Sequence, residues 1–294
     1  MIEIQDVPLS FLNFNIINYP LHNKSKGIES YFYEYINNEN NSQSNLSYLP
    51  IQWTSYLIGQ DYGKNIKELN DFCKNLTMQY PEKRYFTIVQ YDGGPLVEID
   101  NCIVFSSGGM FNTPRLTNQS HINLPLITSP HDYRNKNKYV YKVSYLGRNT
   151  HPVRQALEEN FSSLEGYSVK NLKSDGVKNK DMKKFRKIMS SSIFSLCPRG
   201  YGPASFRFYE SLEMGAIPIY VSDKFILPYT DIIDWEKLCL LVGLDDIESI
   251  PDSVDKIINS NLHYEMSKYG KYCFEKYFNN NFISKNIIET VNKF

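Results

Sequence analysis

The sequence predicts an α/β protein of two domains, each built around strands and helices that alternate. The first observation is a strand, glycine loop, helix and strand in succession, bounded by the apolar runs 193–196 and 217–221, which is the order of a βαβ unit. The second is the length of 294 residues, enough for two domains of ordinary size. The third is the polar, aperiodic stretch 126–138, which is typical of a linker. We therefore expect domains over 1–132 and 138–278.

A helix and two strands are expected in the first domain. Apolar residues recur every three or four positions from Ile66 to Leu76, which is the period of an amphipathic helix. The runs 85–89 and 102–105 are β-type, and together with the helix they make a half-sheet of α/β type. The Asn- and Ser-rich stretch 37–47 is expected to be a loop.

The second domain is expected to open with a strand over 140–146, followed by Gly-Arg-Asn-Thr and a helix over 152–160. The Lys-rich stretch 178–187 indicates the solvated face of another helix, which leads into the βαβ unit. Three helices are expected after the βαβ unit, over 247–259, 264–278 and 283–294. The last of them lies in the terminal segment 279–294, which we expect to cross back over the first domain.

Composition argues against several classes of protein. The 32 basic and 32 acidic residues cancel, so there is no net field to attract nucleic acid. The five cysteines are scattered without a CxxC or CxxH spacing, which argues for a reducing compartment and against a zinc site. No stretch approaches the roughly 20 apolar residues of a membrane span. We expect a cytoplasmic protein without a transmembrane segment, and leave peripheral membrane attachment open.

The loop and helix of the βαβ unit carry the polar residues expected to bind a ligand. They follow the carboxyl end of a strand, the edge at which open α/β sheets bind ligands. Ser205 stands where a helix N-cap belongs and Gly215 where a C′ glycine belongs. Arg207 and Glu210 are three residues apart, so both lie on one face of the intervening helix.

These residue types suit a nucleoside diphosphate. Arg199 and Arg207 offer guanidinium groups to its phosphates, while Gly200 and Gly202 allow backbone amides to approach closely. Glu210, one turn further along, can accept hydrogen bonds from ribose hydroxyls. The alternative is that the glycines only shape a turn, that the arginines are solvated, and that Glu210 pairs with one of them. Spacing alone leaves both interpretations open.

The region from Phe194 to Trp235 resembles the exostosin family of glycosyltransferases. The order and spacing of the matching residues are more specific than any glycine motif. The similarity continues more weakly through 84–95, 124–126 and 145–148. The matching residues are Cys197-Pro198-Arg199-Gly200, Ser205, Arg207, Tyr209-Glu210, Gly215-Ala216-Ile217-Pro218-Ile219, Ser222-Asp223, Leu227-Pro228-Tyr229 and Ile233-Asp234-Trp235.

The resemblance implies the GT-B architecture, in which two Rossmann-like domains face each other across a cleft. It implies a donor site in the C-terminal domain and an acceptor site in the N-terminal one. The implied reaction is inverting transfer from a UDP-sugar to a glycan or polysaccharide acceptor, by a hexosyl- or glucuronosyl-type transferase without a metal or cofactor. The implied donor-binding residues are Arg148, Arg199, Gly200, Tyr201, Gly202, Ser205, Arg207 and Glu210.

Inverting transfer needs a base that removes the acceptor proton, and the N-terminal domain should supply it. Asp92, just after the strand 85–89, is the first candidate, although Asp-Gly is also a common turn. Glu98 and His131 are further candidates for the base. Trp53 and Tyr91 are candidates for stacking on acceptor sugars, with ordinary core packing as the alternative for both.

Two further roles in the second domain are expected of basic residues. Arg148, just beyond the first strand of that domain, is expected to bridge to the diphosphate, unless it is a surface arginine. Lys224 and Arg154 are candidates for recognising a uronic acid.

Two alternative functions also stay open: a GT-B enzyme that uses a GDP-sugar, similar to a fucosyltransferase, and an inactive protein that binds a nucleotide or carbohydrate.

Overall fold

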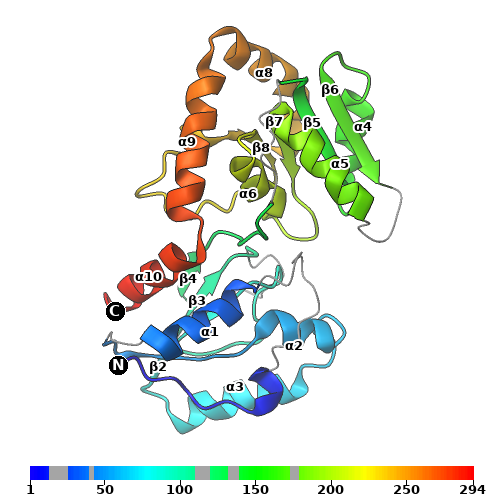
Figure 1. Ribbon diagram of the computed structural model, residues 1–294. Coiled ribbons are helices and arrows are strands. Elements are labelled where there is room, and N and C mark those ends of the chain that lie inside the picture. The colour runs from blue at the N-terminus through cyan, green and yellow to red at the C-terminus, as the bar shows by residue number, and fades with distance from the viewer. Residues whose placement is uncertain (13–25, 40–42, 110–119, 132–138, 173–178) are drawn as a thin grey trace. The chain divides into compact units, whose positions relative to one another are not determined.

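The computed structural model describes residues 1–12, 26–39, 43–109, 120–131, 139–172 and 179–294. The chain forms two compact units (Figure 1). Unit 1 comprises Met1–Ser129 and Asn279–Phe294, and unit 2 comprises Pro130–Phe278. Both contain a wholly parallel sheet with helices, so the predicted α/β class is confirmed. Within the described ranges, no helix has the length and apolar character needed to cross a membrane.

The described residues of unit 1 form a four-stranded sheet in the order β1-β2-β3-β4. The described strands therefore follow the order of the sequence without a reversal. The strands are β1 (Leu46–Tyr48), β2 (Arg84–Val89), β3 (Cys102–Ser106) and β4 (Ser120–Asn123). The helices are η1 (Leu9–Leu12), α1 (Ile28–Glu39), α2 (Trp53–Gly59), α3 (Lys67–Gln79) and α10 (Asn280–Val291).

The alternation of side chains along β2 gives each face of this sheet its own core. Tyr85 and Val89 pack with the apolar residues of α2 and α3, while Phe86 packs edge-on against Phe32 of α1. Figure 1 shows α1 and α3 on opposite sides of the sheet. Because both faces of the sheet are covered, every residue of β2 from Tyr85 to Val89 is buried, which is typical of a strand in the interior of a parallel sheet.

Glu29, in the first turn of α1, ties three segments of unit 1 together. Glu29 is only 4% exposed, and its carboxylate accepts a hydrogen bond from the main-chain amide of Gln90 at 2.7 Å. It also accepts bonds from the Thr54 amide at 3.0 Å and the Thr54 hydroxyl at 2.8 Å. Glu29 therefore fixes Gln90, which lies just after β2 and two residues before Asp92.

Glu29 gives a predicted dependence of stability on pH. Burial raises its pKa from 4.5 to about 7, although the bonds from Gln90 and Thr54 oppose the rise. The folded state therefore binds this proton more tightly than the unfolded state does. Its stabilisation is full below the unfolded pKa and is lost as the pH rises through about 7, by up to about 3 kcal/mol.

Urea unfolding of the wild type and of Glu29→Gln, at about pH 5 and about pH 8, measures this effect. The stability difference between the two proteins should favour the wild type more strongly at the lower pH, because the other titrating groups cancel in the comparison. A difference that is the same at both pH values would contradict the prediction.

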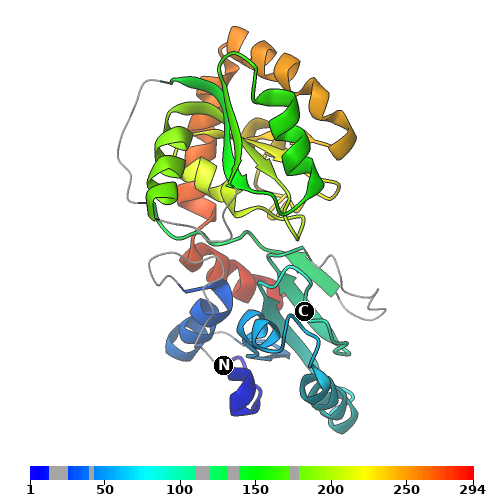
Figure 2. The ribbon, with the colours of Figure 1, turned by 90° about the vertical axis from the view of Figure 1, so that its right-hand side faces the viewer.

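In the described part of unit 2, five strands form a sheet in the order β6-β5-β7-β8-β9. Helices α4 and α5 lie on opposite sides of this sheet (Figure 2). The strands are β5 (Tyr141–Arg148), β6 (Tyr167–Leu172), β7 (Ser192–Pro198), β8 (Ile217–Val221) and β9 (Leu240–Val242). The helices are α4 (Pro152–Phe161), α5 (Asn179–Ser190), α6 (Phe206–Glu213), α7 (Trp235–Leu238), η2 (Leu244–Ser249), α8 (Ile250–Asn259) and α9 (Leu262–Tyr277).

The order of these strands reverses between β5 and β7. This is the flavodoxin-like order of an open α/β sheet, in which ligands bind at the carboxyl ends of the two strands beside the reversal. The last paired residues of β5 and β7 are Ser144 and Ser195. Beyond them, β5 pairs with β6 as far as Arg148, while β7 pairs with β8 as far as Pro198. The carboxyl ends of β5 and β7 therefore separate, which makes room for side chains between them.

Candidate functional site

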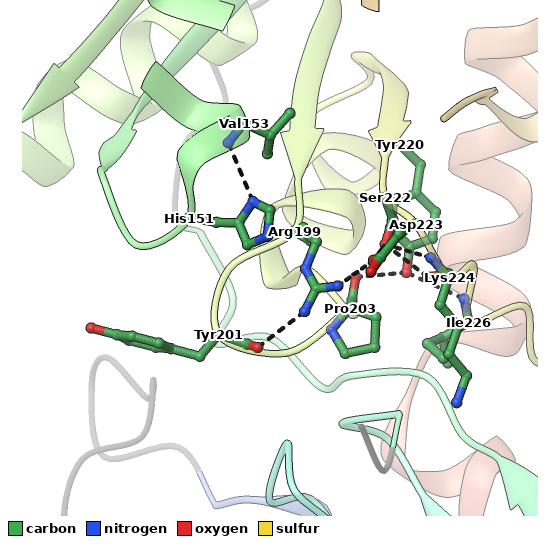
Figure 3. Close-up of polar contacts among 10 residues, drawn as sticks. All are labelled: His151, Val153, Arg199, Tyr201, Pro203, Tyr220, Ser222, Asp223, Lys224 and Ile226. Atoms are coloured by element: carbon green, nitrogen blue, oxygen red, sulfur yellow. Dashed lines mark hydrogen bonds and ion pairs between the residues drawn. The ribbon is translucent and has the colours of Figure 1, made fainter. Parts of the chain in front are cut away.

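Arg199 is the centre of a polar cluster at the carboxyl ends of β7 and β8. It is 8% exposed, its guanidinium forms an ion pair with Asp223, and Nη2 donates to the Tyr201 carbonyl at 3.2 Å. Figure 3 shows Arg199 between His151 and Asp223. Partial burial would raise the pKa of Asp223, but the bond and charge of Arg199 hold it below its usual value. Asp223 therefore already compensates the charge of Arg199. Arg199 is not the solvated arginine that the sequence left open as an alternative.

Arg154, on α4, holds two loops together. Its Nε donates to the Arg199 carbonyl at 2.8 Å, and its two terminal nitrogens donate to the carbonyls of Arg148 and Pro198 at 3.0 and 3.1 Å. The Arg148 and Pro198 carbonyls belong to the carboxyl ends of β5 and β7, and the Arg199 carbonyl belongs to the loop after β7. The ends of these two strands do not pair with each other beyond Ser144 and Ser195. The structure thus gives Arg154 a role inside the protein, in place of the expected recognition of a uronic acid.

Gly200 lies directly against the Arg154 guanidinium. A side-chain carbon at this position would be 3.0 Å from Nη2 of Arg154 and 3.1 Å from the Thr150 hydroxyl. Its amide donates to the Gly202 carbonyl at 3.1 Å. The expectation that the Gly200 amide approaches a phosphate is therefore wrong for this conformation, because the loop itself uses that donor.

Arg207, in the first turn of α6, has a different environment. Its Nη2 donates to the Leu146 carbonyl at 2.7 Å, and the guanidinium lies 4.5 Å from the centre of the Tyr145 ring and 5.4 Å from that of Phe185. Its Nε is buried, and among the described residues it has no hydrogen-bond partner. No carboxylate in that part of the chain forms an ion pair with this side chain. Arg207 therefore keeps an uncompensated positive charge beside the strand reversal.

Glu210 lies one turn further along α6 and is oriented by a histidine. His131 Nε2 is 2.9 Å from Glu210 Oε1, and the Glu210 side chain retains 14% exposure. The side chain of His131 is only 1% exposed, and its Nδ1 accepts a bond from Nε of Arg186 at 3.2 Å. The candidacy of His131 as the acceptor base is therefore wrong: it is buried, both ring nitrogens are bonded, and it belongs to unit 2.

The remaining donor-site candidates lie at the same sheet edge. Ser205 is the N-cap of α6, with φ −131° and ψ 120°, but its side chain makes no capping hydrogen bond. Gly215, expected as the C′ glycine of α6 and not as a donor-site residue, has φ +80° and lies before the amino end of β8. Arg148 is exposed at the last position of β5. Tyr201 is 70% exposed, and its ring points away from Arg199 in Figure 3.

The candidates in unit 1 have mixed outcomes. Trp53 is fully buried, and its indole N–H donates to the Thr87 hydroxyl at 2.7 Å. Stacking of Trp53 on an acceptor sugar is therefore wrong, because the ring belongs to the core. Tyr91 is partly buried against the core of α2 and α3, and Glu98 is exposed. Asp92, also partly exposed, follows the carboxyl end of β2.

Close packing fixes the backbone of Asp92. A side-chain carbon on Gly108, just after β3, would lie 2.6 Å from the Cα of Asp92. The loops after β2 and β3 can therefore approach this closely only with glycine at position 108. This contact sets the position from which the Asp92 side chain projects.

Sequence reasoning did not select His151 or Asp223 as site residues. His151 is the N-cap of α4, and its side chain accepts a bond from the Val153 amide at 3.3 Å. Burial, followed by the charge of Arg199, lowers the pKa of His151. A signal for both was available, because each residue closely follows a predicted strand, where polar side chains meet at the ligand-binding edge.

The described residues include no group of three or more His, Cys, Asp or Glu side chains arranged to hold a metal ion. The cluster at the strand reversal is instead rich in guanidinium groups. Such a site suits an anionic ligand with several oxygen acceptors.

Comparison with known proteins agrees with this chemistry. The model of the exostosin GT47 domain matches residues 88–259, more than half of the chain. The chain belongs to the exostosin GT47 family. The match includes β5, the strand reversal and α6, so the site of unit 2 lies wholly within the exostosin GT47 domain.

Curated relatives match over shorter stretches. An exostosin-1 homologue of Caenorhabditis elegans is 39% identical over 72 residues, 24% of this chain and 19% of the relative. A protein of Oryza sativa subsp. japonica, described as a probable glucuronosyltransferase, is 34% identical over 86 residues, 29% of this chain and 20% of the relative. The matched stretches thus span about a fifth of these relatives. Among solved structures, TarM has a TM-score of 0.45 at 11% identity, with 89% of this chain and 57% of TarM covered.

Proposed function

We propose that this exostosin GT47 chain is a glycosyltransferase that binds a nucleoside diphosphate sugar, with UDP as the nucleotide, in unit 2. The uncompensated guanidinium of Arg207 carries the proposal. A cation that is partly buried and has no carboxylate partner is costly unless an anion completes the site. The diphosphate of the donor is such an anion, and it would lie at the sheet edge where the strand order reverses.

The same position explains how the protein would assist the reaction. When the sugar leaves, negative charge grows on the β-phosphate, and a fixed cation stabilises this charge more in the transition state than in the ground state. The Leu146 carbonyl and the Tyr145 ring hold Arg207 before the ligand arrives. Arg148, exposed at the end of β5, supplies a second guanidinium, and no metal ion is required.

We assign the acceptor to unit 1 and the role of general base to Asp92. An inverting single displacement needs a carboxylate near the attacking hydroxyl, on the side of the sugar opposite the nucleotide. Asp92 follows a buried strand, and Gly108 and Glu29 fix the backbone around it. The acceptor in this proposal is a glycan or polysaccharide. Partial exposure of Tyr91 makes its ring the remaining candidate for stacking on that acceptor.

The nature of the donor sugar rests on the relatives. Several curated relatives are described as probable glucuronosyltransferases, which favours a uronic acid among the candidate sugars. Lys224, exposed in the segment after β8, is the basic residue we assign to a uronic carboxylate. The five cysteines are buried and free, which supports the proposal of a reducing, cytoplasmic environment.

The test is thermal stabilisation of the purified protein by UDP, GDP, CDP and ADP at equal concentration. We expect UDP to raise Tm most, while uridine and inorganic pyrophosphate, each lacking part of the ligand, raise it less. Selective stabilisation by GDP would favour the fucosyltransferase-like alternative. No shift with any nucleotide would overturn the proposal. Release of UDP from UDP-sugars in the presence of glycan acceptors then separates an enzyme from an inactive binding protein.

Gly147 provides an independent prediction. A side-chain carbon at this position would lie 2.5 Å from the Tyr145 hydroxyl and 2.8 Å from Nη2 of Arg207. Gly147→Ala should therefore displace the guanidinium and weaken UDP binding by about tenfold or more, the usual effect of losing a charge-assisted hydrogen bond. Isothermal titration calorimetry measures the change.

The matched control for this substitution is Gly59→Ala, since nothing lies within 4 Å of a side-chain carbon at Gly59. Its UDP affinity should equal that of the wild type. Equal affinity for UDP in the wild type and Gly147→Ala would contradict the assignment of Arg207 to the diphosphate.

A further inference from the structure

His131 links two acidic residues of α6 to the start of unit 2. Its ring contacts Glu210 Oε1 at 2.9 Å, and its main-chain amide donates to Glu213 Oε1 at 2.8 Å. The imidazole packs near the ring of Phe185, with the ring centres 5.8 Å apart. A buried histidine with this many bonds to one helix has a definite orientation.

The hydrogen bonds also determine the position of the imidazole proton. Nε of Arg186 can only donate, so Nδ1 of His131, at 3.2 Å from it, must be the acceptor. The proton of the neutral ring therefore lies on Nε2 and is donated to Glu210 Oε1. Among the described residues, Oε2 of Glu210 accepts no hydrogen bond, so one carboxylate oxygen is held while the other is available.

This arrangement also keeps Glu210 away from Arg207. The two side chains are three residues apart on one helix, the spacing at which an acidic and a basic side chain pair. The structure has no such pair: Glu210 is bonded to His131 and Arg207 to the Leu146 carbonyl. Phe185 contacts both His131 and Arg207, so α5 supports the two groups in separate positions.

We propose that His131 is a positioning residue for the donor nucleotide: it fixes the Glu210 carboxylate so that Oε2 accepts a hydrogen bond from a ribose hydroxyl. A glutamate that is fixed before binding loses less side-chain freedom when the ligand arrives, so its bond contributes more to affinity. This inference rests on the proposed function, because it assumes that the nucleotide binds in unit 2.

The experiment compares binding of UDP and of 2′,3′-dideoxy-UDP, which lacks both ribose hydroxyls, by isothermal titration calorimetry. The wild type should prefer UDP by about tenfold or more, and Glu210→Gln should lose most of this preference. His131→Phe, which keeps a ring but has no donor, should lose it to the same extent. His131→Gln, whose amide can still donate to Glu210, should retain most of it.

The ratio of the two affinities distinguishes positioning from mere structural support, since general damage to the site would weaken both ligands equally. The double variant with His131→Phe and Glu210→Gln should show no further loss of preference beyond either single variant. If His131→Phe does not fold, as judged by circular dichroism, His131→Asn replaces it, because its amide is too short to reach Glu210.

A preference for UDP that survives in His131→Phe but disappears in Glu210→Gln would overturn the inference and leave the proposed function standing. A preference that survives in both variants would also overturn it, since Glu210 would then not contact the ribose. No binding of UDP by the wild type would overturn the proposed function itself.

Discussion

Arg207→Ala should lower kcat/KM for transfer by about 10³-fold, the largest loss we expect from a single substitution in unit 2. Removing the guanidinium takes away a positive charge at the strand reversal that, among the described residues, has no carboxylate partner. The loss should fall mainly on kcat, because the charge on the diphosphate grows as the bond to the sugar breaks. Steady-state kinetics with the UDP-sugar that the wild type uses measures it.

Arg207→Lys is the informative companion variant. An ammonium group keeps the charge but cannot present the planar pair of donors that a guanidinium offers to phosphate oxygens. We expect partial recovery of kcat relative to Arg207→Ala, with a thermal stability close to that of the wild type. Activity within a few-fold of the wild type in Arg207→Ala would show that another cation stabilises the leaving group.

Asp92→Asn should lower kcat by roughly 10²- to 10⁴-fold, as expected for the loss of a general base. The amide keeps the size and polarity of the side chain but cannot accept the proton of the acceptor hydroxyl. The affinity for UDP should not change, because the nucleotide is assigned to unit 2. Kinetics of transfer, together with calorimetry for UDP, tests both parts of the prediction.

Glu98→Gln is the matched control for Asp92→Asn, because Glu98 was also a candidate base and lies exposed in the same loop. It should retain the activity of the wild type. The opposite pattern, with loss in Glu98→Gln and none in Asp92→Asn, would transfer the role of base to Glu98.

The elements with strong apolar periodicity could be predicted from the sequence. The predicted strand 217–221 has the same first and last residues as β8. The helix expected from Ile66 onward corresponds to α3. Short or polar strands could not be predicted. β4, with the sequence Ser-His-Ile-Asn and little burial, lacks alternation, and its place depends on pairing with β3. The stretch 37–47, expected to be a loop, contains the end of α1 and the beginning of β1.

In the site, local spacing predicted positions but not partners. The placement of Arg207 and Glu210 on one short helix followed from spacing and from helix end signals. The ion pair of Arg199 with Asp223 joins residues 24 apart, and the bond of His131 to Glu210 joins residues 79 apart. Such contacts depend on the register of the whole sheet, which no local pattern contains. The same limit explains Trp53, whose partner Thr87 lies on another element.

The composition of unit 1 has a consequence for the order in which the protein acquires its structure during synthesis. Unit 2 is one uninterrupted stretch, whereas unit 1 needs α10 from the opposite end of the polypeptide. Ile283, Ile287 and Val291 of α10 are buried, and the Val291 carbonyl accepts a bond from the Ser44 hydroxyl at 2.9 Å. Although the ribosome makes most of unit 1 first, that unit can complete its core only after unit 2 has been translated. The fold of unit 2, by contrast, needs no residue that is translated after Phe278.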